Sequence, residues 1–455
     1  MSYDLLLTGG RVFTPAGLVD AALAIQGGKI AAIGETGPAE RTIDCTGLTI
    51  LPGVIDTQVH FREPGLTHKE DLETGSRSAV LGGVTAVFEM PNTHPNTDTA
   101  QAIQDKLDRA RGRMWCDHAF YIGATQQNAE LLAEAERVPG CCGVKLFMGS
   151  STGTLLVGDD KGLIAAMRHG SRRMALHAED EDRLIERAHL RVEGDPTSHP
   201  VWRDRETALK ATRRAIAAAR ETGRRIHILH VSNPDELALI AEHRDLVTAE
   251  VTPQHLTLAA EDAYPRHGTL AQMNPPIRGV AEREGLWHWL GQGVVDVIGS
   301  DHAPHTLDEK SRPYPQSPSG MPGVQTLLPL MLHHAAEGRL SLERVVDLTS
   351  AGAARIFGIA GQGRITTGFT ASLTVVDLKA RWTVGEAWLA SRCGWSPFAG
   401  TELTGKPIGT IIRGQMVMWD AELQGAPAGE PLSFLETLKH LGAAGGALSH
   451  RPASA

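Results

Sequence analysis

Strand-like and helix-like segments alternate through the middle of the chain, and this alternation restricts the possible folds more than any other feature of the sequence. Eight apolar runs that end at polar or turn-forming residues are typical of buried strands: 54–60, 83–90, 118–122, 143–148, 174–177, 226–231, 247–252 and 294–300. Helix-like segments separate them, for example at 69–81, 100–111, 126–137, 204–222, 234–243 and 281–291. This order predicts an α/β fold, a TIM-like (β/α)8 barrel. An open doubly wound sheet is the alternative, but no glycine-rich phosphate loop follows the first strand.

The two ends of the chain have a different character from its middle. Residues 1–52 alternate short β-rich runs with glycine-containing turns, which predicts hairpins without helices, and a similar pattern returns near the other end. We expect the two ends to pair into one small β-sandwich. The predicted division is 1–52 for the first part of the sandwich, 53–358 for the barrel, 359–430 for the second part and 431–455 for a C-terminal tail.

Two further segments have compositions that depart from the rest of the chain. Residues 307–323 are rich in proline, serine and glycine and follow the last predicted strand, which favours a lid rather than a linker. Residues 442–455 (GAAGGALSHRPASA) are expected to be disordered.

Composition excludes several classes of protein. The net charge is -9 with no long Lys/Arg block, so neither nucleic acid nor a membrane surface is an expected partner. The five cysteines show no CxxC spacing, which indicates a reducing compartment. The sequence has no signal-peptide pattern and no apolar run long enough to span a bilayer, so we expect a cytoplasmic protein. We also expect it to act on a small molecule and to form a homo-oligomer such as a dimer.

Side chains that can bind a metal ion occur at the ends of the predicted strands. They are His60, Lys145, His177, His230 and Asp301. Each alone has a structural explanation, since a His is often only hydrogen-bonded, a Lys can extend to the rim and an Asp can cap a helix. Five on one rim favour an active site, because (β/α)8 enzymes keep their sites at the carboxyl ends of the strands. On the first strand, Gln58, His60 and Arg62 share one face.

The residue types also indicate the metal. Imidazole and carboxylate donors without thiolates suit Zn²⁺, with Mn²⁺ or Co²⁺ as substitutes. A buried Lys145 with a lowered pKa could react with carbon dioxide to form a carbamate, which would bridge two ions. Two cations on the rim would activate water and polarise a carbonyl group.

Four stretches together resemble the dihydroorotases of the cyclic amidohydrolase group: 58–65 (QVHFREPG), 90–93 (MPNT), 143–147 (GVKLF) and 300–305 (SDHAPH). The resemblance extends over most of the chain. It implies metal binding by His60, Lys145, His177, His230 and Asp301, with Asp301 also moving a proton. Gln58 stands where the family usually has a His, so the ion beside Gln58 should be held less tightly than the ion beside His177 and His230.

The resemblance also implies a substrate. Arg62, Asn92 and His305 match a clamp for the exocyclic carboxylate of dihydroorotate, and Asn274 matches a residue that contacts the ring. The implied reaction is the reversible conversion of L-dihydroorotate and water to N-carbamoyl-L-aspartate in pyrimidine (UMP) biosynthesis, with one or two Zn²⁺ ions.

Two alternatives stay open at this point. One is an allantoinase or a hydantoinase-like ring-opening enzyme. The other is a catalytically silent homologue that serves as a structural partner of aspartate transcarbamoylase, which Gln58 favours and the other metal-type residues do not. His302 is expected either to contact and position the residues of the site or to have only a structural role.

Overall fold

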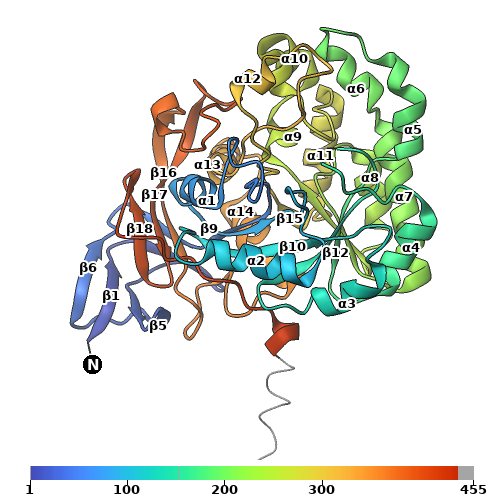
Figure 1. Ribbon diagram of the computed structural model, residues 1–455. Helices are drawn as coiled ribbons and strands as arrows, with labels where there is room; N and C mark the ends of the chain where they lie inside the picture. Colours follow the sequence, from blue (N-terminus) through green and yellow to red (C-terminus); the bar gives the residue numbers. More distant parts are fainter. Residues whose placement is uncertain (1, 152, 439–455) are drawn as a thin grey trace, which may run out of the picture.

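Eight parallel strands form the central sheet, in the order β15-β14-β13-β12-β11-β10-β9-β8 (Figure 1). The structure is a computed structural model that describes residues 2–151 and 153–438. The sheet closes into a barrel where Val59 forms a parallel bridge with His302, beyond the end of β15. The strands are β8 (Val54–Val59), β9 (Val84–Glu89), β10 (Asp117–Gly123), β11 (Cys141–Phe147), β12 (Met174–His177), β13 (Ile226–Ile228), β14 (Val247–Val251) and β15 (Val297–Ile298). The predicted (β/α)8 barrel and its eight strands are confirmed.

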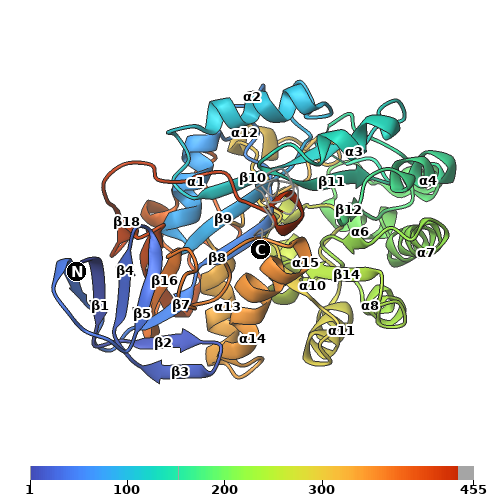
Figure 2. The same ribbon diagram turned by 90° about the horizontal axis from the view of Figure 1, so that it is seen from below.

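Helices surround this sheet (Figures 1 and 2). The longer ones are α1 (Leu72–Leu81), α2 (Ala100–Ala110), α4 (Asp160–Arg168), α7 (Arg205–Thr222), α8 (Pro234–Ala241), α10 (Ala260–His267), α11 (Val280–Gly291) and α13 (Leu327–Ala336). The shorter ones are α3 (Leu132–Ala135), α5 (Glu181–Glu186), α6 (His199–Trp202), α9 (Pro253–Thr257), α12 (Leu307–Lys310), α14 (Leu342–Val346) and α15 (Gly352–Phe357). In the part of the chain that the structure describes, no helix has the length and apolar character needed to cross a membrane.

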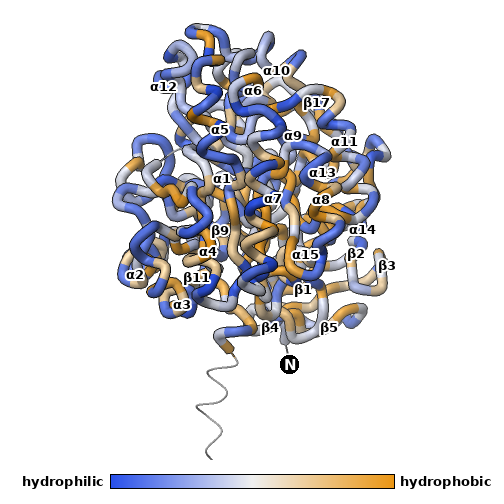
Figure 3. Tube along the Cα trace, turned by 90° about the vertical axis from the view of Figure 1, so that its right-hand side faces the viewer, coloured by the Kyte–Doolittle hydropathy of each residue, from blue (hydrophilic) through white to orange (hydrophobic). Residues whose placement is uncertain are grey.

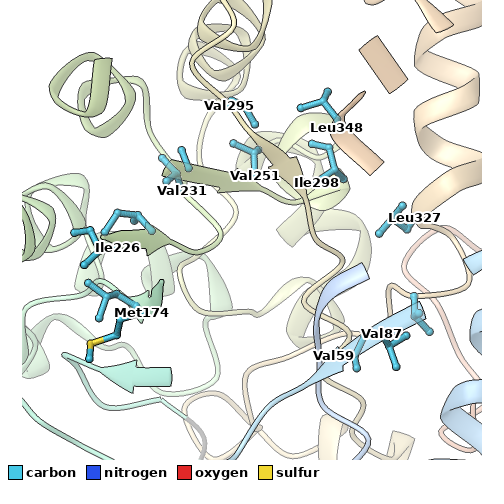
Figure 4. Close-up of a cluster of buried hydrophobic side chains, with 14 of the residues drawn as sticks. Val59, Val87, Met174, Ile226, Val231, Val251, Val295, Ile298, Leu327 and Leu348 are labelled. Carbon is cyan, nitrogen blue, oxygen red and sulfur yellow. The ribbon is translucent and has the colours of Figure 1, made fainter. Parts of the chain in front are cut away.

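Apolar side chains fill the space between the strands and the helices. Figure 4 shows part of this layer, in which Val59, Val87 and Ile226 on the strands lie in one cluster with Leu327 and Leu348 from helical segments. The residues of β8, β9 and β10 are buried on both faces of the sheet, and apolar side chains predominate in these strands. Figure 3 shows the apolar segments concentrated in the interior and the polar ones outside. This packing is what holds the strand ends in place at the mouth of the barrel.

Two sheets lie beside the barrel and contain both ends of the chain. One has the order β5-β4-β1-β6 and the other β19-β18-β17-β16-β7-β2-β3. The first uses β1 (Tyr3–Thr8), β4 (Leu23–Gln26), β5 (Lys29–Ile33) and β6 (Ala39–Asp44). The second uses β2 (Arg11–Thr14), β3 (Gly17–Asp20), β7 (Thr49–Pro52), β16 (Leu373–Thr383), β17 (Glu402–Ile412), β18 (Gln415–Trp419) and β19 (Glu422–Leu423). The predicted pairing of the two ends is confirmed where β7 lies antiparallel to β16.

Some predicted elements are shorter in the structure than in the sequence pattern. The predicted helix 126–137 is only a 3-10 turn (Ala129–Leu131) followed by α3. The predicted strand 226–231 ends at Ile228, and His230 has a φ of 36°, which no strand residue adopts. The tail predicted to be disordered, 442–455, lies outside the described residues.

A segment near the C-terminus closes the barrel at the end opposite the strands' carboxyl ends. Leu432 and Phe434 are buried in a cluster with barrel-interior residues such as Phe88, and Figure 2 shows this segment under the barrel. The ring of Phe434 meets that of Phe88 edge-on at 5.9 Å, and the guanidinium group of Arg172 lies 4.6 Å from its centre.

This packing predicts that Phe434→Ala lowers the free energy of unfolding by about 3–5 kcal/mol, since it leaves a cavity inside the barrel. Chemical denaturation would measure the change. Leu435→Ala, at a neighbouring side chain that is 51% exposed, is the matched control and should change stability little. Equal effects of the two substitutions would contradict a closing role for Phe434.

Candidate active site

A cavity opens at the carboxyl ends of the barrel strands. It is lined by Gln58, His60, Arg62, Asn92, Lys145, Phe147, Ser151, His177, His230, Asn274, Asp301, Ala303, Ser319 and Gly320. Every residue predicted for the site therefore lines one cavity except His305, whose Nε2 lies 3.3 Å from Nη2 of Arg62.

Three of these residues have a backbone conformation that residues other than glycine rarely adopt. The φ angles are 65° at Arg62, 36° at His230 and 45° at Asp301. Each follows a barrel strand, so the chain turns sharply as it leaves the sheet. Such conformations cost about 1–3 kcal/mol each and cluster at functional sites, where the surrounding structure imposes them.

A buried carboxyl group joins the first strand to the last. Asp56 Oδ1 accepts hydrogen bonds from the backbone N–H of Gln58 at 3.1 Å and of Ser300 at 2.9 Å. The backbone N–H of His60 donates to the carbonyl of His302 at 2.7 Å. These bonds hold the residues after β15 against β8 and so bring His60 and Asp301 together.

The first pair of metal-type side chains is His177 and His230. Nδ1 of His177 lies 3.0 Å from Nε2 of His230, and Nε2 of His177 lies 2.9 Å from a carboxylate oxygen of Glu179. Because this carboxylate accepts, His177 carries its proton on Nε2 and turns the lone pair of Nδ1 toward His230. Burial lowers the pKa of both imidazoles and keeps them neutral. Two neutral imidazoles placed in this way can bind one cation.

Glu179 is itself held in place. Arg203 donates to it from Nε and from Nη2, the latter at 2.6 Å. Burial alone would raise the pKa of Glu179, but Arg203 and His177 together bring it below its usual value. The carboxylate is therefore ionised and fixes the orientation of the His177 ring.

The second pair is His60 and Asp301. Nε2 of His60 lies 3.2 Å from Oδ1 of Asp301, and Nδ1 of His60 lies 2.8 Å from the amide oxygen of Asn92. With the proton on Nδ1, the lone pair of Nε2 faces the carboxylate, and a cation between these two acceptors would relieve their repulsion. Gln58 Nε2 donates to the same Oδ1 of Asp301 at 2.9 Å. Gln58 therefore turns its N–H group, rather than its oxygen, toward this pair.

Lys145 lies between the strands that carry these pairs, with its ammonium nitrogen 4.4 Å from the centre of the Phe147 ring. Burial lowers the pKa of Lys145, while the same burial raises the pKa of Asp301. Within residues 2–151 and 153–438, no three His, Cys, Asp or Glu side chains form a group that could hold a metal ion by themselves. The metal-type donors of the cavity come as two pairs, and Lys145 lines the same cavity.

Arg62 forms the opposite wall of the cavity. It is 1% exposed, its Nε donates to the carbonyl of Pro304 at 3.2 Å, and its Nη1 has no hydrogen-bond partner among the described residues. Burial lowers the pKa of Arg62 to about 10, which leaves the guanidinium group charged at neutral pH. A buried N–H group without a partner is costly, so an anionic group of a ligand is expected here.

The predicted lid segment contributes Ser319 and Gly320 to the cavity. Lys310 anchors it by donating to the carbonyl groups of Gln272 and Pro318. Gly320 has a φ of 137°, and a Cβ atom there would lie 2.5 Å from the carbonyl oxygen of Ala303. Only glycine therefore fits at this point of the wall.

Two other predicted residues have clear structural partners. Oδ1 of Asn274 lies 3.0 Å from Nε2 of His199, which orients the amide group at the cavity wall. His302 does not line the cavity. Its Nδ1 accepts a hydrogen bond from the backbone N–H of Gly323, and its Nε2 lies 3.4 Å from a carboxylate oxygen of Glu70.

The sequence analysis missed Glu179 and Lys69, which contact His177 and His305 respectively. Glu179 has a weak signal, since it lies two residues beyond His177 and residues so spaced share a side of an extended chain. Lys69 has none, because it contacts His305 across 236 residues of sequence.

Known proteins are similar to this chain in sequence and in fold. The sequence pattern of the Amidohydrolase family matches residues 49–417. The dihydroorotase of Halobacterium salinarum is 37% identical over 430 residues, which are 92% of this chain and 96% of that protein. The allantoinase of Deinococcus radiodurans is 34% identical over 448 residues, or 95% of this chain and 99% of that protein. The solved L-hydantoinase (dihydropyrimidinase) from Arthrobacter aurescens has a TM-score of 0.90 and 30% identity over 95% of this chain and 100% of that one.

The contact between Glu179 and His177 predicts that Glu179→Gln weakens the binding of added Zn²⁺ about 10- to 100-fold, since the carboxylate no longer orients the imidazole or raises its basicity. Competition with a chelating dye, starting from metal-free protein, would measure this affinity. Glu134→Gln, at an exposed residue of α3, is the control and should bind as tightly as the wild type. Unchanged affinity in Glu179→Gln would show that the pair formed by His177 and His230 is not a metal site.

Proposed function

Because the chain belongs to the amidohydrolase family and is an enzyme that acts on cyclic amides, we propose that its substrate is L-dihydroorotate, which it converts reversibly to N-carbamoyl-L-aspartate. The observation that carries this choice is the buried guanidinium group of Arg62, whose Nη1 lacks a partner at the cavity wall. Dihydroorotate carries an exocyclic carboxylate that can fill this position. Hydantoin, dihydrouracil and allantoin do not carry one.

The clamp that we propose for this carboxylate consists of Arg62, His305 and Asn92. A guanidinium group binds a carboxylate with charge-assisted hydrogen bonds, and it can present two of them in parallel. Nε2 of His305 lies 3.3 Å from Nη2 of Arg62, so the two side chains are neighbours at this wall. Asn274, held by His199, would contact the ring and set its orientation.

Members of the amidohydrolase family generally depend on metal ions, and the donors of this cavity fit such ions. We propose that His177 and His230 hold one ion, that His60 and Asp301 hold a second, and that Lys145, as a carbamate, binds both. When bound, ions such as Zn²⁺ would lower the pKa of a water molecule and polarise the ring carbonyl.

The protein's own residues then complete the reaction. Water adds to the ring carbonyl carbon, the carbon–nitrogen bond breaks, and the leaving nitrogen takes up a proton. Asp301 can carry this proton, because burial raises its pKa toward the neutral range. Gln58 donates to Oδ1 of Asp301 and so holds the carboxylate in a fixed orientation.

Hydrolysis of allantoin is the second candidate, because the Deinococcus radiodurans allantoinase matches this chain over nearly its whole length. A catalytically silent role is disfavoured by the cavity, which the metal-type residues and most of the clamp line together.

A substrate panel with Arg62→Met tests the proposal. The wild type should hydrolyse dihydroorotate in preference to allantoin, hydantoin and dihydrouracil. Arg62→Met should lose about 2–4 kcal/mol of transition-state stabilisation on dihydroorotate, roughly 30- to 1000-fold in kcat/KM, since the carboxylate loses its charged partner. Metal content, measured by elemental analysis, should not change.

Arg111→Met, at a side chain that is 76% exposed, is the matched control and should keep wild-type activity. Preference of the wild type for allantoin, or wild-type efficiency of Arg62→Met on dihydroorotate, would refute the proposed substrate.

Gln58 generates a separate prediction about metal loading. The ion beside His60 and Asp301 has no imidazole from position 58 and should be held more weakly than the ion beside His177 and His230. Titration of metal into stripped protein should therefore give two distinguishable affinities, and Gln58→His should tighten the weaker one. Gln104→His, at an exposed residue of α2, should change neither. Two equally tight sites in the wild type would contradict this prediction.

A further inference from the structure

Lys69 contacts the Nδ1 atom of the imidazole ring of His305. Its ammonium nitrogen lies 3.0 Å from Nδ1 of His305 and 3.1 Å from a carboxylate oxygen of Glu309. Lys69 is 8% exposed and the side chain of His305 is fully buried. These two residues come from distant parts of the sequence and meet only in the folded barrel.

The contact determines where His305 carries its proton. An ammonium group has three N–H donors and no lone pair, so Nδ1 of His305 must be the acceptor. A neutral imidazole has one donor and one acceptor, and the proton is therefore on Nε2. The carbonyl oxygen of Ser319, which can only accept, lies 3.1 Å from Nε2 and takes this proton. Nη2 of Arg62 lies farther away, at 3.3 Å, and makes no hydrogen bond to Nε2 in this tautomer.

The proton on Nε2 gives His305 the correct polarity for an anion. The N–H group on Nε2 donates to the carbonyl oxygen of Ser319 and lies beside Nη2 of Arg62. A carboxylate bound by Arg62 would be a second acceptor for the same N–H group. The other tautomer would turn a lone pair toward this carboxylate and repel it.

Glu309 makes the other tautomer a real alternative. Its second carboxylate oxygen lies 3.8 Å from Nδ1 of His305, close enough to attract a proton to that nitrogen after a small movement. Lys69 occupies this space and donates to both groups at once. Without Lys69, Glu309 would accept from Nδ1 and leave Nε2 bare.

We propose that Lys69 is a positioning residue that fixes the tautomer of His305, so that Nε2 of His305 donates a hydrogen bond, beside Arg62, to the carboxylate of the substrate. The inference rests on the proposed function in one respect, namely that the substrate carries a carboxylate at this wall. The protonation of His305 itself does not depend on the substrate.

Steady-state kinetics on dihydroorotate would test the role of Lys69 in binding. Lys69→Met should raise KM about 10- to 100-fold and change kcat little, because one charge-assisted hydrogen bond becomes a repulsion while the reacting groups stay in place. Lys69→Met combined with Glu309→Gln should restore most of the loss, since the amide group at position 309 can donate to Nδ1. Lys161→Met, at an exposed residue of α4, is the matched control.

The double variant separates tautomer control from a structural role. A merely structural role of Lys69 would lower stability and kcat and would not be corrected by Glu309→Gln. An unchanged KM in Lys69→Met, or a loss that the second substitution does not reverse, would overturn the proposal.

A second measurement needs neither a variant at position 69 nor a substrate. In wild-type protein with ¹⁵N-labelled histidine rings, NMR should show His305 with a protonated Nε2 and a bare Nδ1, and His305→Asn identifies its signal. A proton on Nδ1 would overturn the proposal. If the wild type fails to turn over dihydroorotate but shows the expected tautomer, the substrate assignment fails while the assigned protonation of His305 stands. The same spectrum of Lys69→Met should then show the proton on Nδ1, and an unchanged tautomer there would overturn the role of Lys69.

Discussion

The seam between β8 and the residues after β15 is the contact on which the site depends. Asp56 accepts backbone hydrogen bonds from both sides of it, and His60 donates across it to His302. This seam closes the barrel and places Asp301 beside His60. Without closure, the first and last strands would be opposite edges of an open sheet and their ligands would lie far apart. The relative positions of His60 and Asp301 thus rest on these hydrogen bonds.

Burial is the second constraint, and it explains most of the chemistry. It lowers the pKa of His177, His230 and Lys145, which favours their neutral forms, and it raises the pKa of Asp301 to about 6. Removing these groups from water costs free energy, as do the unusual φ angles of the residues that follow the strands. The large apolar layer around the barrel offsets this cost. Glu179 and Lys69 contact the imidazole rings of His177 and His305, respectively, and orient them.

Much of the fold and of the cavity wall was predictable from local patterns. Buried parallel strands are continuous apolar runs, and the residues at their ends converge whenever the barrel closes, so His60, Lys145, His177, His230 and Asp301 could be brought together without coordinates. Element ends were less predictable. The predicted strand at 226–231 stops at Ile228, because the chain turns at His230 into a conformation that no sequence pattern marks.

The amino-acid sequence by itself determined the (β/α)8 barrel, the pairing of the two chain ends and the residue types at the mouth, because these follow from periodicity and from the alternation of neighbouring segments. Only the tertiary structure decided which atom of each side chain faces which partner. Gln58 turns its N–H group to Asp301, and Lys69 reaches Nδ1 of His305 across 236 residues. Hydrogen-bond direction and tautomer depend on distances of about 3 Å between groups far apart in sequence. Such distances are set by the packing of the whole barrel, and no local pattern contains them.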